Sequence, residues 1–191
     1  MQVVLYILFW VFDVSKERVG LSVSSIIDAF QVYRFITSAF THGGILHILS
    51  NMCYMLLLGI SVESHYGTIF YAILNLFICL LGGTLSIIFY LFLIYVWPIS
   101  LGGGGRYFEI SMIGYSGVIF GLVTIFSTTE PNEASFFGFK VKKVYIPFIM
   151  LVLISVFMSD VSFMGHFSGI IAALLIKYGG LFLLLPRYSW I

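Results

Sequence analysis

Charge is what this sequence has least of. Only 9% of its 191 residues are Asp, Glu, Lys or Arg, and the net charge is +1, whereas roughly a quarter of the residues in soluble domains are charged. The few basic residues form no stripe that could follow a phosphate backbone, so we expect no nucleic-acid partner. Hydrophobic residues make up 61% of the chain. This balance predicts an integral, multi-pass membrane protein whose main partner is the lipid bilayer.

Cysteine is also scarce, and this limits the chemistry. Cys53 and Cys79 lie in apolar segments, with no CxxC spacing and no nearby set of ligands. Neither a metal site nor a disulfide framework is therefore indicated. We expect no metal and no other cofactor. A basic region typical of a signal peptide is likewise missing at the start of the chain.

Apolar runs dominate what is present, and a helix needs about twenty such residues to cross the hydrocarbon. The first run is short for a crossing, and we interpret it as a span truncated at its start. With no internal repeat and no second domain, residues 1–191 are expected to form a single, all-α transmembrane domain with a six-helix bundle. The predicted spans are Met1–Phe12, Leu46–Val62, Thr68–Val96, Met112–Ser127, Val144–Met158 and Phe163–Leu185.

Polar connections separate these runs. The long connection between Asp13 and Ile45 mixes charged and apolar residues, which favours a segment folded at the membrane interface. The stretch "WPISLGGGGRYFEIS" is interpreted as a flexible loop, and two roles stay open for it: a mobile wall of a substrate cleft, or a passive linker. The stretch "TTEPNEASFFGFKVKK" is interpreted as a polar loop.

Unusual polar residues recur where the even-numbered spans begin. If the spans alternate in direction, the starts of spans two, four and six share one side of the membrane. Those starts contain His47 and Asn51, Ser116, and His166 respectively. A residue four positions into a helix lies only about 6 Å below its start. The spacing therefore predicts a polar pocket just beneath the membrane surface.

Taken singly, each of these residues has a structural explanation. Ser116 could bond a backbone carbonyl, and His47 with Asn51 could bond across helices. Small residues change the balance, because a stripe of them on spans four and six permits close contact between the two helices. That contact would let His166 accept the hydroxyl proton of Ser116, while the pair on span two stabilises an oxyanion. The stripe residues are Gly117, Gly121, Gly165 and Gly169.

Three motifs carry a resemblance to a known family. "GYSG" contains Ser116, "HILSN" contains His47 and Asn51, and "GHFSG" contains His166. In this order and on these spans, they resemble the GxSG motif, the HxxxN motif and the histidine–glycine motif of the rhomboid intramembrane serine proteases. A lone GxSG is a weak signal, whereas several motifs in order are a strong one.

Further positions match the family less closely. The resemblance assigns Gly114 and Phe120 to the surroundings of the reacting groups, and Phe120 stands where many members carry a tyrosine. Tyr33 replaces a tryptophan before Arg34 in "YRFITSAFTHGG", and Glu63 in "GISVESHYG" matches a glutamate-containing turn. Phe120 keeps an aromatic ring and lacks the tyrosine hydroxyl.

The resemblance implies a function. Family members use a serine and histidine dyad without an essential acid, so Asp160 is not expected to complete a triad. Their substrates are transmembrane segments of other, single-span membrane proteins, which unwind locally before cleavage. Two alternatives stay open: a rhomboid-like pseudoprotease that binds or delivers membrane proteins without cutting them, and a transporter or proton channel that uses its histidines as relays. The distribution of basic residues between the two sides weakly favours a pocket that opens away from the cytosol.

Overall fold

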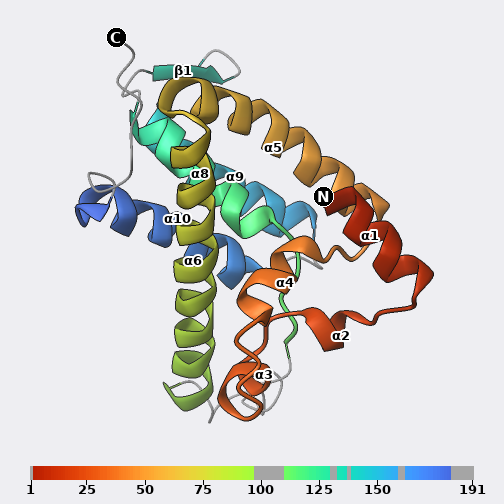
Figure 1. The fold of residues 1–191 in the computed structure, drawn as a ribbon. Coiled ribbons are helices and arrows are strands. Elements are labelled where there is room, and N and C mark those ends of the chain that lie inside the picture. Colours follow the sequence, from red (N-terminus) through yellow and green to blue (C-terminus); the bar gives the residue numbers. More distant parts are fainter. Residues whose placement is uncertain (1, 97–109, 130–132, 137–138, 159–161, 182–191) are drawn as a thin grey trace.

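A computed structural model of the chain describes residues 2–96, 110–129, 133–136, 139–158 and 162–181, and it is mostly helical (Figure 1). The α-helices are α1 Gln2–Val11, α2 Lys16–Val19, α3 Val23–Ile27, α4 Arg34–Phe40, α5 Ile45–Tyr66, α6 Thr68–Val96, α8 Ser116–Thr129, α9 Ile146–Phe157 and α10 Phe163–Tyr178. A short 3-10 turn, η1 Lys143–Tyr145, leads into α9. Strands β1 Glu133–Phe136 and β2 Phe139–Lys142 form an antiparallel hairpin.

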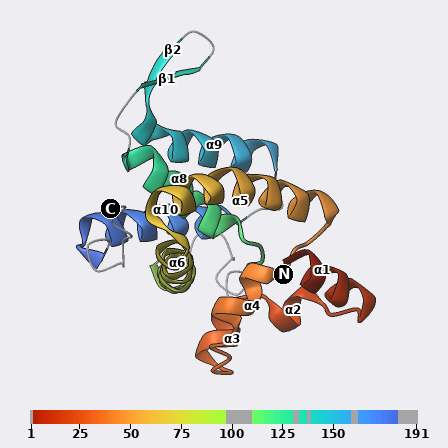
Figure 2. The ribbon, with the colours of Figure 1, turned by 45° about the horizontal axis from the view of Figure 1, so that its top comes forward.

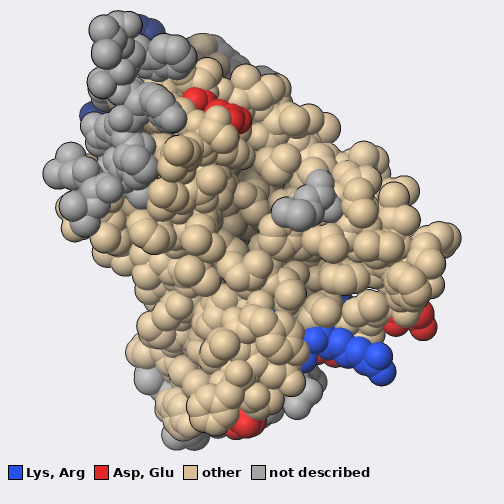
Figure 3. Space-filling model, in the orientation of Figure 1, with Lys and Arg blue, Asp and Glu red and all other residues tan. Residues whose placement is uncertain are grey.

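Among the described residues, two helices are long and apolar enough to cross a bilayer. They are α5, with 22 residues and a mean hydropathy of 1.8, and the 28-residue stretch Thr68–Tyr95 of α6, with a mean hydropathy of 2.5. Apolar side chains also face outward, among them Leu57, which is 73% exposed, and Phe157, which is 81% exposed. Figure 3 shows the charged residues of one face near its margins, with uncharged residues between them. Such a surface suits lipid rather than water.

Helix α8 occupies the interior of the bundle. Nine of its 14 residues are buried, and it packs against α5, α6, α9 and α10. Figure 2 shows α5 and α9 on one side of it, with α10 and α6 on the other. A helix buried around most of its circumference has little contact with lipid. The start of α8, at Ser116 and Gly117, is only partly buried.

The long connection after α1 folds into the short helices α2, α3 and α4. Arg34 begins α4 and is buried, and its Nη1 donates hydrogen bonds to the carbonyl oxygens of Glu17, at 2.6 Å, and Gly20, at 2.8 Å. A buried guanidinium requires such acceptors. Arg34 thereby ties the backbone around α2 to α4.

Helix α8, which corresponds to the fourth predicted span, begins later than predicted. It starts at Ser116 rather than Met112, because Met112 exchanges two backbone hydrogen bonds with Leu21, which hold it extended. Gly114 then adopts a φ of +105° and donates its N–H to the carbonyl of Ser38 at 2.9 Å. The chain thus approaches Ser116 as an extended segment followed by a turn.

Other boundaries compare as follows. Helix α6 has the same limits as the third predicted span, and α5 extends the second predicted span at both ends. The connection after α8 contains the β1–β2 hairpin, where sequence analysis predicted only a polar loop. Residues 97–109 of the predicted glycine-rich loop, and the end of the sixth predicted span after residue 181, lie outside the described residues.

Candidate active site

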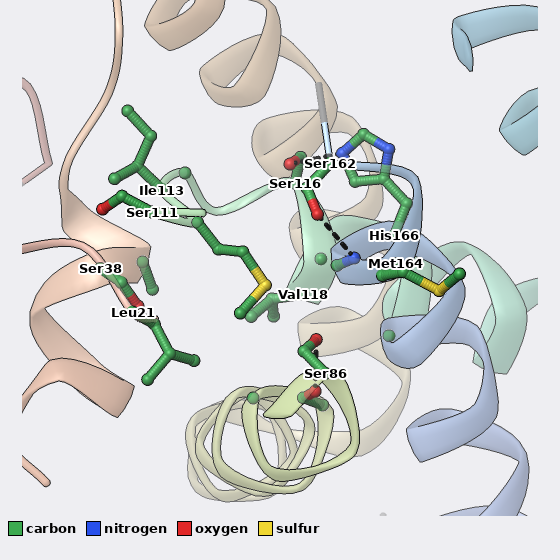
Figure 4. A pocket seen from close by; sticks show the side chains of 18 of the residues that line it. Leu21, Ser38, Ser86, Ser111, Ile113, Ser116, Val118, Ser162, Met164 and His166 are labelled. Atoms are coloured by element: carbon green, nitrogen blue, oxygen red, sulfur yellow. Dashed lines mark hydrogen bonds between the residues drawn. The ribbon is translucent and has the colours of Figure 1, made fainter. Parts of the chain in front are cut away.

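Ser116 and His166 lie together although fifty positions separate them. Ser116 is the first residue of α8, and His166 is the fourth residue of α10. The serine Oγ and the histidine Nε2 are 2.7 Å apart, within hydrogen-bond distance. The imidazole is 4% exposed, whereas the serine is only partly buried. Figure 4 shows the two side chains pointing toward each other at the cavity.

Close contact between α8 and α10 brings this pair together. A methyl group added at Gly169 would collide with the carbonyl oxygen of Gly117. One added at Gly117 would lie 3.2 Å from the carbonyl oxygen of Gly165. A methyl group added at Gly121 would also lie 3.2 Å from a carbonyl oxygen, that of Gly169. Only small residues permit two helix backbones to approach this closely.

Phe120 covers one face of the His166 ring. The two rings are stacked, with centroids 4.5 Å apart and an interplanar angle of 23°. Phe120 is 1% exposed, so the surrounding core fixes its position. His166 Nδ1 is buried and has no hydrogen-bond partner among the described residues. Asp160 lies outside those residues.

His47 and Asn51 lie against Gly114, next to the start of α8. A methyl group on Gly114 would lie 2.6 Å from His47 Nε2 and 3.6 Å from Asn51 Nδ2. Both nitrogens are buried and have no partner among the described residues. His47 Nδ1 accepts the N–H of Gly43 at 3.4 Å, which leaves Nε2 as the proton-bearing nitrogen in the neutral ring. Two unused donors thus flank the turn before Ser116.

His42 adds a second imidazole beside His47. The two rings meet edge to face, with centroids 5.1 Å apart. His42 lies in the connection between α4 and α5 and is 7% exposed. Burial, reinforced by the neighbouring His47 and partly offset by a backbone contact with Phe40, lowers the pKa of His42 to about 4. His42 is therefore neutral near pH 7 and adds no positive charge to this region.

Comparison with known proteins decides the family. The family model for the rhomboid domain matches residues 29–182. The chain belongs to the rhomboid family. It is 31% identical over 175 residues to rhomboid-like protein 15 of Arabidopsis thaliana, covering 87% of this chain and 41% of that protein. It is 28% identical over 144 residues to the mitochondrial rhomboid-like protein 14 of the same plant, covering 74% of this chain and 41% of that protein.

A relative from another organism also matches this rhomboid chain. It is 26% identical over 127 residues to rhomboid-like protease 3 of Toxoplasma gondii, covering 59% of this chain and 46% of the relative. The chain thus spans less than half the length of each of these relatives. Membership of the family agrees with the apolar surface described above, since rhomboids are membrane proteins.

A cavity of about 1400 Å³ opens beside the Ser116–His166 pair of this rhomboid domain. Its lining includes both of these residues, together with His47, Gly114, Gly117, Gly165 and Gly169. Asn51, Phe120 and Gly121 do not line it and stand behind the wall. The predicted residues therefore divide into those that face the cavity and those that support it.

Several polar residues at the site were not predicted from the sequence. Tyr90 of α6 and Ser162 bring their hydroxyl oxygens within 3.1 Å of each other, and both residues line the cavity. Tyr115 donates a hydrogen bond to the side-chain carbonyl of Asn75, which anchors the residue before Ser116 to α6. Ser162 carries a usable signal, because a serine just before an apolar helical run is a typical N-cap. Tyr90 and Asn75 stand in an apolar run with no signal of their own.

Proposed function

We propose that this rhomboid domain is an intramembrane serine endopeptidase with Ser116 as its nucleophile and His166 as its general base. The observation that carries the proposal is the 2.7 Å approach of Ser116 Oγ to His166 Nε2 beside a large cavity. A neutral imidazole at this distance can take the hydroxyl proton as the serine attacks a carbonyl. Stacking on Phe120 keeps the imidazole in place during that transfer.

The next steps follow from the same geometry. Attack on a peptide carbonyl places a negative charge on its oxygen, and the proposed donors for it are His47 and Asn51, which lie against Gly114, and the first N–H groups of α8. The protonated His166 then gives its proton to the departing amine, which leaves an acyl group on Ser116. Water, deprotonated by His166, then attacks the acyl carbon, and His166 returns the proton to Ser116 Oγ as the carboxyl product leaves. The name of the Toxoplasma relative, which describes a protease, supports this chemistry.

The proposed substrate is a transmembrane segment of a single-span membrane protein. A peptide bond within a helix has its carbonyl engaged in the helix, so the segment must unwind before Ser116 can attack it. A cavity of about 1400 Å³ offers room for several unwound residues. Apolar side chains exposed around the bundle suit arrival of the substrate through lipid.

We place the whole chain in the membrane as one multi-pass domain with six spans. Helices α5 and α6 meet the length required for a crossing. Helices α8, α9 and α10 are shorter but apolar. Helix α8 packs against both long helices, α10 packs against α6 and α8, and α9 packs against α8 and α10. The ten residues of α1 form the proposed first span, which is the shortest of the six.

Two other functions compete with proteolysis. A pseudoprotease would bind the same substrates without an activated serine, whereas Ser116 and His166 are both present and in contact. A transporter or proton channel would need a relay of ionisable groups across the membrane, whereas Glu63 is the only acidic residue that α5, α6, α8, α9 and α10 contain among the described residues. Both observations favour the protease.

A serine-directed fluorophosphonate separates these functions. We expect the purified chain to be labelled on Ser116, as located by peptide mass spectrometry, and Ser116→Ala to remain unlabelled. His166→Ala should lose at least about a hundredfold in labelling rate, because the base is gone. Since the two residues act as a unit, the double variant should be no worse than either single one in proteolysis. A parent chain that resists the probe while folded would favour the pseudoprotease.

A further inference from the structure

Tyr90 and Ser162 join α6 to the start of α10, close to His166. Tyr90 is 5% exposed, and its hydroxyl oxygen lies 3.1 Å from the Oγ of Ser162. Both residues line the cavity that contains Ser116. Their contact therefore lies inside the proposed active site.

Ser162 controls the backbone of the first turn of α10. Its Oγ accepts the N–H of Gly165 at 3.0 Å, and its carbonyl oxygen accepts the N–H of His166 at 3.1 Å (Figure 4 shows the first of these bonds). An N-cap residue fixes where a helix begins and how its first turn is oriented. Because the N–H of His166 is bonded directly to this cap residue, a shift of Ser162 moves the imidazole with it.

Helices α6 and α10 have a second point of contact. A methyl group on Gly82 would lie 3.6 Å from the Cα of Gly169, so the two backbones nearly touch there. Tyr90 lies eight residues after Gly82, and Ser162 lies seven residues before Gly169, which are separations of about 12 and about 10 Å along the two helices. Helix α10 packs extensively against α6, and the Tyr90–Ser162 contact lies at the end of this interface where α10 begins. His166 lies between these two points on α10.

We infer that Tyr90 is a positioning residue for the dyad, acting through the Ser162 cap to hold His166 Nε2 at hydrogen-bond distance from Ser116. The inference rests on the proposed protease function and names a residue that this function does not itself require. Tyr90 does not take part in the chemistry. Its hydroxyl group, rather than its ring, carries the role, because the hydroxyl makes the contact with Ser162.

Tyr90→Phe tests this inference, since it removes the hydroxyl and keeps the ring. Labelling by a rhodamine fluorophosphonate gives two constants, the probe affinity KI and the maximal rate kinact. We expect kinact to fall about tenfold, because catalysis is sensitive to small displacements of the reacting groups, while KI and Tm stay near those of the parent. The matched control is Tyr95→Phe, which changes a tyrosine that is 75% exposed on the same helix.

Variants of Ser162 complete the experiment. Ser162→Ala should lower kinact as Tyr90→Phe does, Ser162→Thr should retain most of the parent rate because it keeps the Oγ, and the Tyr90→Phe/Ser162→Ala double variant should be no slower than Ser162→Ala alone. Parent-like kinact in Tyr90→Phe, or a loss explained entirely by less folded protein, would overturn the positioning role. Labelling that persists in Ser116→Ala would instead overturn the proposed function.

Discussion

Gly114 shows how one residue can shape the proposed site. Its φ of +105° lies in a backbone region that residues with a side chain rarely adopt. A methyl group on Gly114 would also lie 2.6 Å from His47 Nε2. Glycine thus satisfies a backbone requirement and leaves space for a neighbouring donor. The sequence motif indicated this position, but the φ value and the contact with His47 required the three-dimensional structure.

His47 and Asn51 provide a test at the same scale. If they donate hydrogen bonds to the oxyanion, their partner exists only in the transition state, so truncation should lower kcat far more than it raises KM. Loss of one such donor typically costs about a hundredfold to a thousandfold in kcat. Asn51 stands behind the cavity wall, and we expect Asn51→Ala to retain weak cleavage. His47 lines the cavity, and we expect His47→Ala to lose more of the cleavage rate.

Purified variants in detergent give the required numbers. Turnover is measured per folded molecule, and Tm is measured alongside it. If the two side chains only hold helices together, Tm should fall while turnover per folded molecule stays at the parent value. That result in both variants would remove their oxyanion role.

At the scale of helices, glycine spacing decides which elements meet. Gly169→Ala should destabilise the chain by about 1 to 3 kcal/mol, since its new methyl group collides with the backbone of Gly117 and the core must shift. Activity should fall with it, because the displaced helices carry Ser116 and His166. Gly82→Ala is the matched control: its methyl group meets ordinary contacts, at 3.6 Å and beyond, and alanine favours helix by up to about 1 kcal/mol.

Thermal unfolding and cleavage rates of the two alanine variants check this contrast. We expect Tm to fall for Gly169→Ala and to hold or rise for Gly82→Ala. Equal Tm values in both variants and the parent would show that α8 and α10 are not in close contact.

Helices were easier to predict than their ends and connections. The apolar run from Thr68 to Val96 predicted both ends of α6, because an uninterrupted apolar run long enough to cross a bilayer can be recognised in the sequence. The start of α8 was predicted four residues early, because Met112 pairs with Leu21, ninety-one positions away in the chain. Contacts across such separations, including Tyr90 with Ser162, leave no periodic signal in the sequence.

At the scale of the whole molecule, a mostly uncharged exterior surrounds a polar interior site. Ser116, His47 and His166 come from the starts of α8, α5 and α10, as the alternation of spans predicts, and they meet at one cavity. Burying polar groups in an apolar bundle is costly unless they find polar partners, so unpaired ones are candidates for a functional role. Among the described residues, His47 Nε2, Asn51 Nδ2 and His166 Nδ1 are buried without a partner, which is the cost expected if the proposed substrate site is built from them.

Cleavage within a membrane tests the central claim most directly. The chain is co-expressed with a panel of tagged single-span membrane proteins, in parallel with Ser116→Ala at matched abundance, and the fragments are sized by mass spectrometry. We predict that the parent chain releases a fragment cut within or at the edge of a transmembrane segment and that Ser116→Ala releases none. The same fragments at the same rate from Ser116→Ala would contradict the account.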